Sequence, residues 1–521
     1  MHALWIPLAF TAGVAAFALL PAARQNPRLL WSFLGSAAVL AVWAGILFAA
    51  ARSKGRTFAL EIVLRKQHYL QACAQGSVML YWGWYWRQVY DAAPLIAAQL
   101  VFAYAFDMLL TWSRRDRYTL GFGPFPIIFS TNLFLWFKAD WFYLQFLMIA
   151  VGMAAKELIR WKKDGRDSHI FNPSSFPLGL FSLVLILTGT TNLTWGYEVA
   201  TTLFQPPHIY LFIFLIGLPG QFLFGVTTMT MSAVVTTFLF SQIFYWATGT
   251  YYFIDTNVPI AVFLGMHLLF TDPSTSPRTE LGRVMFGVLY GLSVVVLYRV
   301  LTLMGAPTFY DKLMAVPILN LTIKGIDAVA RSKALARFDP ARLAPSLKGR
   351  PRHAVFIATW ATIFLAITAA NGLGDTHPGH RLQFWVEACA ENRVNACRTL
   401  AGILDRQCQD GSGWACNEFG MLYVEAGSST PQTAAALTRA CDAGFQPGCE
   451  NARAAAAGRQ PSARALPAPK DYFILLRDGK GPLPDRTPLE LYGRACRQGW
   501  ADGCLNACQL GDRAACAVAG R

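Results

Sequence analysis

The feature that most constrains this chain is a long stretch that is almost free of charge. Between Asp167 and Asp255, Glu198 is the only acidic residue, and no lysine or arginine occurs. Since a helix needs about 20 apolar residues to cross a bilayer, this stretch has room for several membrane helices. Over the whole chain only 14% of residues are charged, against roughly a quarter in an ordinary soluble domain. The sequence therefore predicts a protein that lies mainly in a lipid bilayer.

Each long apolar run is predicted to form a helix, because lipid offers no hydrogen bonds to an open backbone. The predicted fold class is therefore all-α, a polytopic membrane helix bundle. We expect about thirteen membrane helices, at residues 3–21, 30–51, 68–88, 93–112, 118–137, 139–158, 173–190, 208–226, 228–247, 257–271, 284–304, 309–329 and 353–371. The ranges 68–88 and 309–329 are the most polar, and each has a second interpretation as a helix that lies in the membrane interface.

Lysine and arginine are concentrated in three connections, and this asymmetry predicts the orientation of the chain. The basic connections are 52–66, 156–166 and 331–352, whereas 190–207, 248–256 and 305–311 contain acidic residues but no lysine or arginine. Basic connections stay in the cytoplasm. We therefore expect a bacterial inner-membrane protein with a cytoplasmic amino terminus and a periplasmic domain after residue 372. The net charge of +15 does not indicate a nucleic-acid partner, because the cations lie in these short blocks.

Three features inside the predicted membrane helices are open to interpretation. Residues 81–86 read Tyr-Trp-Gly-Trp-Tyr-Trp, which is typical of interfacial anchors and also suits stacking on a cofactor. Asp107 lies in the range 93–112, where a charge is costly, so its carboxylate should face protein or water. This residue is interpreted as an ion or proton site, as a partner in a helix–helix hydrogen bond, or as a residue that lies nearer the membrane interface. Cys73 is expected to be a buried apolar residue.

Ten of the eleven cysteines follow residue 388 and recur as pairs that are eight positions apart. The pairs are Cys389 with Cys397, Cys408 with Cys416, Cys441 with Cys449, Cys496 with Cys504, and Cys508 with Cys516. A glycine between two helix-forming stretches predicts helical hairpins whose sulfurs are bridged across the turn. Zinc is the rival interpretation, but zinc ligands usually lie about two to four residues apart, often with histidine. Disulfides are favoured, and they require an oxidising compartment.

These segments resemble Sel1-like repeats of the cysteine-rich, α-helical kind, over about 385–450 and 485–518. The resemblance implies a small disulfide-bonded α-helical repeat domain that binds a protein partner. The stretch 453–470 is rich in alanine, proline and arginine, which is typical of a linker between two blocks.

Two short sequences in the membrane region share a pattern. They read His169-Ile-Phe-Asn-Pro-Ser-Ser175 and His267-Leu-Leu-Phe-Thr-Asp-Pro-Ser-Thr-Ser-Pro277. Asn172 or Asp272 can cap a helix while the proline that follows occupies the first turn. Both are predicted on the cytoplasmic side, where two helix starts would direct N–H groups at one place, suited to a phosphate, a carboxylate or a flavin carbonyl. The alternative is two tight loops that begin membrane helices.

This order of motifs, followed by Gly282-Arg283 and a helix with Phe286-Gly287, resembles the membrane subunit shared by the Rnf electron-transport complex (RnfD) and the sodium-pumping NADH:quinone oxidoreductase (NqrB). The resemblance covers about residues 90–335 and extends to related proteins found with enediyne biosynthesis genes. It implies two structural half-repeats, a flavin (FMN or riboflavin), and electron transfer with other membrane or periplasmic subunits. The neighbours of a noncovalent flavin would be Asn172, Ser174, Asp272 and Ser274.

Redox members of that family also carry a flavin esterified to a threonine in an outer loop, in a motif that reads roughly Asp-x-x-Ser-Gly-Ala-Thr. This chain has Trp195-Gly-Tyr-Glu-Val-Ala-Thr201 at the corresponding place. Ala200 and Thr201 match the motif, whereas Glu198 and Val199 replace Ser and Gly. Val199 restricts a backbone that glycine leaves free. Thr201 is therefore the candidate for covalent attachment, with a plain structural loop as the alternative.

The predicted domains are N-terminal membrane helices (1–88), an RnfD/NqrB-like membrane domain (89–335), a basic cytoplasmic loop with the last membrane helix (336–372), Sel1-like cysteine repeats (373–452), a linker (453–484) and a second cysteine block (485–521). The resemblance implies a non-autonomous subunit of an oxidoreductase complex that relays electrons through flavin and recruits a partner through its repeats. The alternative is a membrane scaffold or small-molecule permease that keeps the fold without redox activity.

Overall fold

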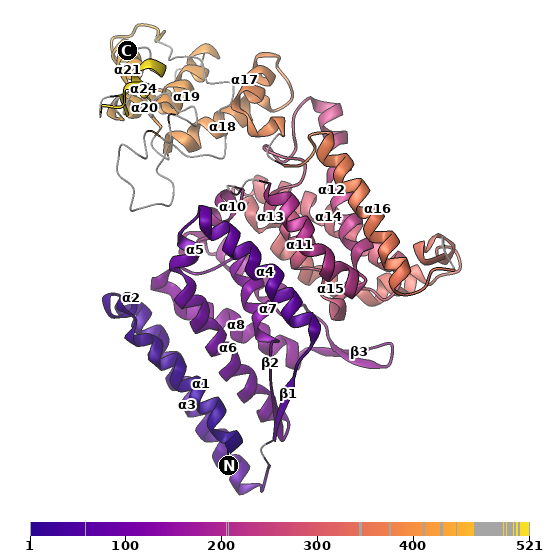
Figure 1. Cartoon of the computed structure of the whole chain (residues 1–521). Helices are drawn as coiled ribbons and strands as arrows, with labels where there is room; N and C mark the ends of the chain where they lie inside the picture. The colour runs from indigo at the N-terminus through magenta and orange to yellow at the C-terminus, as the bar shows by residue number, and fades with distance from the viewer. Residues whose placement is uncertain are drawn as a thin grey trace. The chain divides into compact units, whose positions relative to one another are not determined.

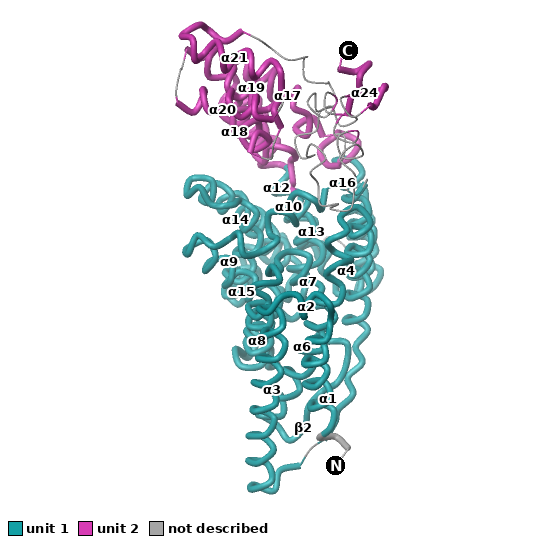
Figure 2. Tube along the Cα trace, turned by 90° about the vertical axis from the view of Figure 1, so that its left-hand side faces the viewer, with its two compact units in different colours: residues 1–238, 260–367 teal, residues 239–259, 368–521 magenta. Residues whose placement is uncertain are grey.

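The chain divides into two compact units, which Figure 2 shows in different colours. Unit 1 comprises residues 1–238 and 260–367, and unit 2 comprises residues 239–259 and 368–521. The computed structural model describes residues 2–57, 59–204, 206, 208–342, 346–374, 377–409, 412–427, 431–443, 445–462, 493, 496, 504, 507, 508 and 511–519.

Helices dominate both units, and Figure 1 follows them along the chain. Those that begin before residue 368 are α1 (His2–Ala16), α2 (Pro21–Gln25), α3 (Pro27–Ser53), α4 (Lys66–Tyr85), α5 (Gln88–Asp91), α6 (Ala93–Arg114), α7 (Pro124–Asn132), α8 (Phe142–Leu158), α9 (Ser175–Leu187), α10 (Gly196–Thr202), α11 (Ile209–Phe224), α12 (Thr227–Thr248), α13 (Ile260–Leu268), α14 (Glu280–Leu303), α15 (Asp311–Ala330) and α16 (Arg350–Ala369). Unit 2 adds α17 (Leu382–Ala390), α18 (Ala396–Gln409), α19 (Gly413–Glu425), α20 (Pro431–Asp442), α21 (Gln446–Ala456) and α24 (Arg513–Val518).

Six helices of the described chain are long and apolar enough to cross a membrane. They lie at 27–53, 93–114, 227–248, 280–303, 308–330 and 350–369. The all-α fold class is confirmed, and the six helices are consistent with a membrane protein. Of the two most polar predicted ranges, 309–329 falls within one of these six helices. The range 68–88 corresponds to α4, which is not among the six. All thirteen predicted ranges contain a helix, but the other seven helices are shorter or more polar.

Two predicted membrane helices are too short to cross a bilayer. Helices α7 and α13 have nine residues each, and at about 1.5 Å per residue they reach roughly half-way across a bilayer. The prediction of a complete span is therefore wrong at 118–137 and 257–271. Both ranges are apolar because their residues are buried in protein, and hydropathy does not distinguish a protein interior from lipid.

Buried amide side chains stabilise the non-helical chain that follows α7. The backbone N–H of Phe137 donates to Oε1 of Gln145 (3.0 Å), and Nε2 of Gln145 donates to Oε1 of Gln99 (3.0 Å). Gln99 and Asn132, the last residue of α7, exchange two hydrogen bonds of 3.1 and 2.7 Å. These amides supply the hydrogen bonds that lipid cannot give to a chain leaving its helix.

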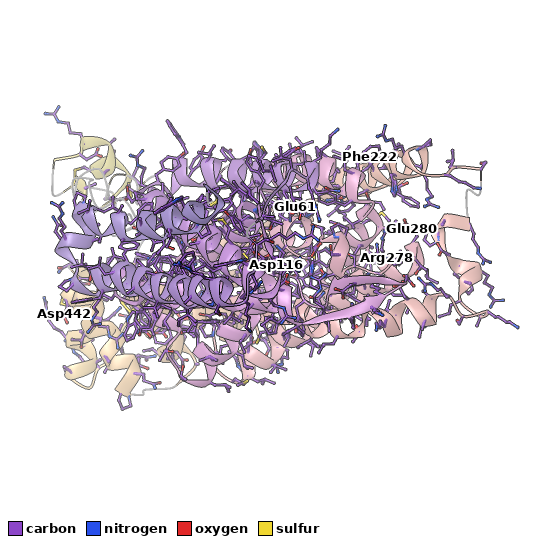
Figure 3. The ribbon with its side chains drawn as sticks, turned by 90° about the horizontal axis from the view of Figure 1, so that it is seen from below. Glu61, Asp116, Phe222, Arg278, Glu280 and Asp442 are labelled. Atoms are coloured by element: carbon purple, nitrogen blue, oxygen red, sulfur yellow. A yellow bond between two sulfur atoms is a disulfide. The ribbon has the colours of Figure 1, made fainter. Side chains whose placement is uncertain are left out.

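Two small sheets accompany the helices of unit 1. Strand β1 (Ala59–Val63) pairs in parallel with β2 (Arg117–Gly121), and Figure 3 labels Glu61 on β1 and Asp116 just before β2. Strands β3 (Arg160–Lys163) and β4 (Arg166–His169) form an antiparallel hairpin. Its turn residues Asp164 and Gly165 have φ of 49° and 75°, the left-handed backbone that a two-residue hairpin turn requires. This hairpin leads directly into the Asn-Pro sequence.

The tryptophans of the segment 81–86 divide between the protein interior and the outer surface. Trp82 and Trp86 are fully buried, and their ring centroids lie 6.4 and 5.6 Å from that of Trp136, whereas Trp84 is 72% exposed. The anchor interpretation is therefore wrong for Trp82 and Trp86, because residues four apart share the face of α4 that packs inward. The expectation that Cys73 is buried is also wrong, since this residue is exposed on α4.

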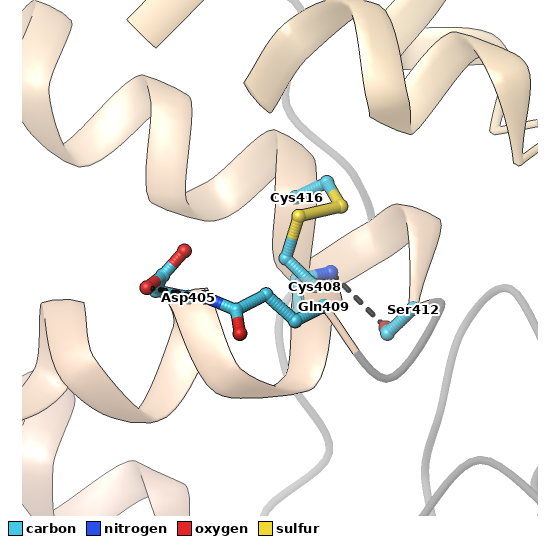
Figure 4. The surroundings of a disulfide bond; sticks show 6 residues. Asp405, Cys408, Gln409, Ser412 and Cys416 are labelled. Atoms are coloured by element: carbon cyan, nitrogen blue, oxygen red, sulfur yellow. Dashed lines mark hydrogen bonds between the residues drawn. A yellow bond between two sulfur atoms is a disulfide. The ribbon is translucent and has the colours of Figure 1, made fainter. Parts of the chain in front are cut away.

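Five disulfides join the cysteines as the constant spacing predicts. The bridges are Cys389–Cys397, Cys408–Cys416, Cys441–Cys449, Cys496–Cys504 and Cys508–Cys516. The first three each link the end of one helix to the start of the next. Figure 4 shows Cys408–Cys416, where the N–H of Cys416 donates to the carbonyl of Ser412 (3.0 Å) and so begins α19. Most of the predicted linker and of the second cysteine block lies outside the described residues.

Within unit 2, the cysteine-rich tail packs on the connection between α12 and α13. The guanidinium of Arg393 donates to the carbonyl of Gly249 (3.0 Å), and the hydroxyl of Thr250 donates to the carbonyl of Val394 (3.2 Å). The amide of Asn257 donates to the carbonyl of Gly372 (3.2 Å). The tail is therefore hydrogen-bonded to the connection 248–256, which carries no lysine or arginine.

We expect thiol alkylation without reductant to label Cys73 and no other cysteine of the intact protein. The other ten sulfurs are paired, and Cys73 is exposed. Mass spectrometry of the maleimide-treated chain gives the count of labels, and Cys73→Ser should remove the signal. Labelling of the tail cysteines before reduction would contradict the bridges.

The stability of unit 2 should respond to Asp255→Asn in a pH-dependent way. Burial raises the pKa of Asp255 to about 7, while Arg406 opposes the shift. This carboxyl therefore stabilises the fold below its unfolded pKa, and the contribution is lost as pH rises through 7. We expect Asp255→Asn to raise the thermal midpoint by a few degrees at pH 8 and to change little at pH 4.

Exposed Asp442, which Figure 3 labels, supplies the matched control, since Asp442→Asn should leave the midpoint unchanged at both values of pH. Burial also lowers the pKa of His377 and of His380 to about 3, so the parent protein and both variants share the loss of stability in acid. Equal effects of Asp255→Asn at pH 8 and pH 4 would show that Asp255 is not a buried titrating group.

Candidate functional site

The two motifs singled out in the sequence meet in unit 1, and we call residues 169–175 the Asn-Pro corner and residues 267–277 the Asp-Pro corner. The amide Nδ2 of Asn172 donates to the carbonyl of Leu269 across the two corners (3.0 Å). Nε2 of His169 lies 3.2 Å from Oδ2 of Asp272. Residues that are about a hundred positions apart in the chain therefore form one structure.

Asn172 uses its whole side chain to hold the Asn-Pro corner. Its Oδ1 accepts hydrogen bonds from the backbone N–H of Ser174 and of Ser175, both 3.0 Å long, and from the hydroxyl of Ser174 (2.9 Å). Asn172 therefore holds the turn that leads into α9, but the N-cap of this helix is Ser174, so Asn172 and Pro173 precede the helix that they were predicted to begin. Asn320 of α15 completes the joint, since its Oδ1 accepts from the N–H of Asn172 (3.1 Å) and its Nδ2 donates to the carbonyl of Thr275 (3.2 Å).

Asp272 caps a shorter element than the sequence predicts. Its Oδ1 accepts from the N–H of Ser274 (2.9 Å) at the start of a single 3-10 turn, Pro273–Thr275. The long helix α14 begins later, at Glu280, and is capped by the hydroxyl of Thr279. The chain between them remains extended because Pro277 disfavours helical conformation at Ser276. Asp327 of α15 accepts from the N–H of Arg278 (2.9 Å), so this extended chain is also hydrogen-bonded.

The β3–β4 hairpin attaches to the Asp-Pro corner through Lys163. Its ammonium group donates to the carbonyl of Ser276 (2.5 Å) and to that of Ser274 (3.4 Å). Burial lowers the pKa of Lys163 to about 8, with Arg278 adding to the shift and Asp327 opposing it. The hairpin is also held by the ion pair between Asp164 and Arg331 (3.2 Å). The basic connection 156–166 is therefore part of the site.

A cavity of about 500 Å³ lies beside the two corners. Both corners line it, together with α4, α6, α8, the second half of β2 and the start of α7. Its volume is in the range of sites for small molecules and cofactors. The four residues proposed from the resemblance as neighbours of a flavin, Asn172, Ser174, Asp272 and Ser274, all line this cavity.

Most charges that line the cavity are paired with each other. Arg115 pairs with Glu157, and Arg160 pairs with Asp167 (2.7 Å). Two cations, Arg65 and Lys156, have no carboxylate within ion-pair distance among the residues that the structure describes. They give the cavity positive charge that is free to meet a ligand.

Asp107 of α6 also lines the cavity. Within the described chain its carboxylate makes neither a hydrogen bond nor an ion pair, so the interpretation as a helix–helix hydrogen bond finds no support. The other two interpretations, an ion or proton site and a position nearer the membrane interface, stay predictions. Among the described residues, the charged groups of the cavity without an ion-pair partner are then two cations and one carboxyl group.

Thr201 lies apart from this cavity, on the short helix α10. It is half-buried, and its hydroxyl donates to the carbonyls of Tyr197 (3.1 Å) and Glu198 (3.3 Å) in the preceding turn. The segment expected to be a loop is helical. Attachment of a flavin would require this hydroxyl to leave its intrahelical bonds.

Sequence reasoning did not identify several charged and polar groups that line the cavity. Arg65 and Lys156 were interpreted as determinants of orientation, because lysine and arginine next to membrane helices usually have that role. His68 and Gln71 belong to the polar range 68–88, which was predicted to be a membrane or interfacial helix, and both line the cavity as a polar stripe at the start of α4. A polar stripe directly after a basic block was the signal that could have placed α4 at a site.

No family model matches the chain, and neither a curated protein nor a solved structure matches it.

We expect Asn172→Ala to destabilise unit 1 by about 2 to 4 kcal/mol, because it leaves two buried N–H groups and one buried carbonyl without partners. Chemical or thermal unfolding in nanodiscs measures the change. The control is Ser274→Ala in the other corner, since this hydroxyl makes no hydrogen bond within the described chain and its loss should cost less than about 0.5 kcal/mol. Equal losses of stability from the two substitutions would show that Asn172 does not hold the two corners together.

Proposed function

We propose that this chain is a bacterial inner-membrane subunit that holds an anionic small molecule in the cavity between the Asn-Pro and Asp-Pro corners. The first candidate ligand is a noncovalent flavin, with FMN favoured over riboflavin because its phosphate suits the unpaired cations. The observation that carries the proposal is the meeting of both corners at one cavity with Arg65 and Lys156 on its wall.

Charge and size support an anion of this class. A phosphate or carboxylate near Arg65 and Lys156 would gain charge-assisted hydrogen bonds, which are about twice as strong as neutral ones. The cavity of about 500 Å³ has room for a nucleotide-sized molecule. The exposed amide of Gln67 and the half-buried amide of Gln71 add donors and acceptors on the same wall.

The chain's own groups would bind and orient such a ligand. A bound flavin would supply the transfer of one or two electrons. Arg65 and Lys156 would hold its phosphate, and the joined corners would keep the wall rigid, because Asn172 and Asp272 are already bonded to each other's segments. Under this proposal the tail recruits a partner subunit from the periplasmic side.

A second function, an anion permease or scaffold without redox activity, is favoured by a separate observation. The side-chain oxygens of Asn172 and Asp272 are occupied by the corners themselves, and the hydroxyl of Thr201 is bonded within α10. The residues that the resemblance assigns to flavin are thus not the free groups of the site. The free groups, Arg65, Lys156 and Asp107, are also those that an anion carrier with a proton site would need.

The visible spectrum of the protein purified in mild detergent separates the two functions. We expect flavin absorbance near about 450 nm that moves to the supernatant on acid precipitation, because the ligand is held by charge. Lys156→Gln should reduce the bound flavin at least about tenfold, which corresponds to about 1.4 kcal/mol. Lys162→Gln is the matched control, since Lys162 is exposed in the same basic block and does not line the cavity.

Thr201→Ala should leave the flavin content unchanged. Flavin fluorescence that stays with the denatured chain and disappears in Thr201→Ala would instead show covalent attachment. A colourless protein from riboflavin-rich cells would contradict the redox proposal and leave the permease, for which Lys156→Gln should abolish binding of inorganic phosphate or a carboxylate measured by calorimetry.

A further inference from the structure

A second polar cluster lies in unit 1, outside the cavity described above. Nε2 of His267, both side-chain amide atoms of Gln221 and Nε1 of Trp360 are buried without a hydrogen-bond partner. The three side chains are 2%, 1% and 0% exposed. They come from α13, α11 and α16. Buried polar atoms without partners are rare in folded proteins, so four of them in one place require an explanation.

The side chains of His267 and Gln221 both pack against Gly217. A methyl group added at Gly217 would lie 3.2 Å from Cδ2 of His267 and 3.4 Å from Nε2 of Gln221. The rings of His267 and Trp360 have centroids 6.0 Å apart. A side chain at position 217 would therefore press on both His267 and Gln221, and glycine lets these two polar side chains lie close to the backbone of α11.

A hydrogen bond at Nδ1 of His267 determines which polar groups this cluster offers. Nδ1 of His267 lies 2.8 Å from the carbonyl of Phe263, which can only accept. Nδ1 therefore carries the proton, and in the neutral ring Nε2 presents a lone pair. The site thus combines an acceptor on His267, a donor on Trp360, and one of each on Gln221.

Aromatic rings enclose the cluster. Phe214 stacks on Phe364 with centroids 4.0 Å apart, and the ring of Phe263 lies 4.1 Å from that of His267. The rings of Phe214 and Trp360 form a T-shaped contact with each other, with centroids 5.6 Å apart. Such walls favour an uncharged occupant, because an ion would lose its hydration without gaining a counter-charge.

We propose that His267, Gln221 and Trp360 form a binding site for a water-sized, uncharged hydrogen-bonding molecule next to Gly217. The molecule donates to Nε2 of His267 and bonds to the amide of Gln221, so it satisfies buried groups that otherwise have no partner. Water and ammonia share this chemistry. The site is independent of the flavin or anion proposal, since none of its three residues lines the corner cavity.

A cryo-EM map at about 2 Å resolution, of the full chain in nanodiscs, tests the proposal. We expect a density peak within hydrogen-bonding distance, about 2.7 to 3.2 Å, of Nε2 of His267 and of the amide of Gln221. Persistence of the peak in ammonium-free buffer identifies water, and a peak that needs added ammonium chloride identifies ammonia. Absence of a peak under both conditions overturns the proposal.

Two glycine substitutions on α11 provide a matched pair. Gly217→Ala should remove the peak and lower the thermal midpoint by several degrees, because the methyl group would push His267 and Gln221 out of their positions. Gly220→Ala should do neither, since its methyl group would meet only Cε2 of Phe224 at an ordinary 3.6 Å.

Unfolding of the single and double variants gives a second readout that does not need a map. Gln221→Leu and His267→Leu should each lower the midpoint, because each removes the bound molecule and leaves the other residue unsatisfied. The double variant should lose less than the sum of the two. If no molecule is bound, each single substitution removes an unsatisfied polar group and raises the thermal midpoint. That result would overturn the proposal.

Discussion

The structure of unit 1 depends on one constraint: a backbone that leaves its helix at membrane depth must find hydrogen bonds within the protein. Helices α7 and α13 each end after nine residues and continue as non-helical chain. The side chain of Gln145 is hydrogen-bonded to the backbone of the first of these segments. The side chains of Asn172, Asn320 and Asp327 are hydrogen-bonded to the backbone of the second. The buried amides and carboxylates are therefore structural requirements of the interrupted helices.

The same constraint shapes the candidate site. Because Asn172 and Asp272 are bonded to backbone groups, the two corners form rigid walls and do not offer their oxygens to a ligand. The groups that remain available belong to the helices around them, namely Arg65 before α4, Asp107 on α6 and Lys156 on α8. A site of this kind recognises charge and size. It is consistent with an anionic cofactor and also with a transported anion.

Much of the architecture could be predicted from the sequence, because the patterns reflect strong local physics. The scarcity of charge indicates a membrane, and a constant spacing of eight indicates bridges across helical hairpins. The similarity of the sequences at Asn172 and Asp272 anticipated that both would lie at one place. The length of α7 and α13 could not be predicted, since hydropathy is equal for residues that face lipid and residues that face protein.

The unpaired charged groups of the cavity could not be identified from the sequence either. Lysine and arginine beside membrane helices determine orientation in most proteins, so Lys156 carried no distinct signal. The inward turn of Trp82 and Trp86 depends on Trp136 and Trp195, which are distant in sequence. In each case the missing information was the identity of a neighbour that is distant in sequence, which periodicity within one segment does not contain.

The most direct test of the account is a double-mutant cycle on His169 and Asp272, whose side chains lie 3.2 Å apart across the two corners. Unfolding free energies of His169→Ala, Asp272→Ala and the double variant in nanodiscs give the coupling energy. The account predicts a favourable coupling of about 1 kcal/mol, as expected for residues in direct contact. Additive effects, with a coupling near zero, would mean that the corners do not meet and would contradict the joined site.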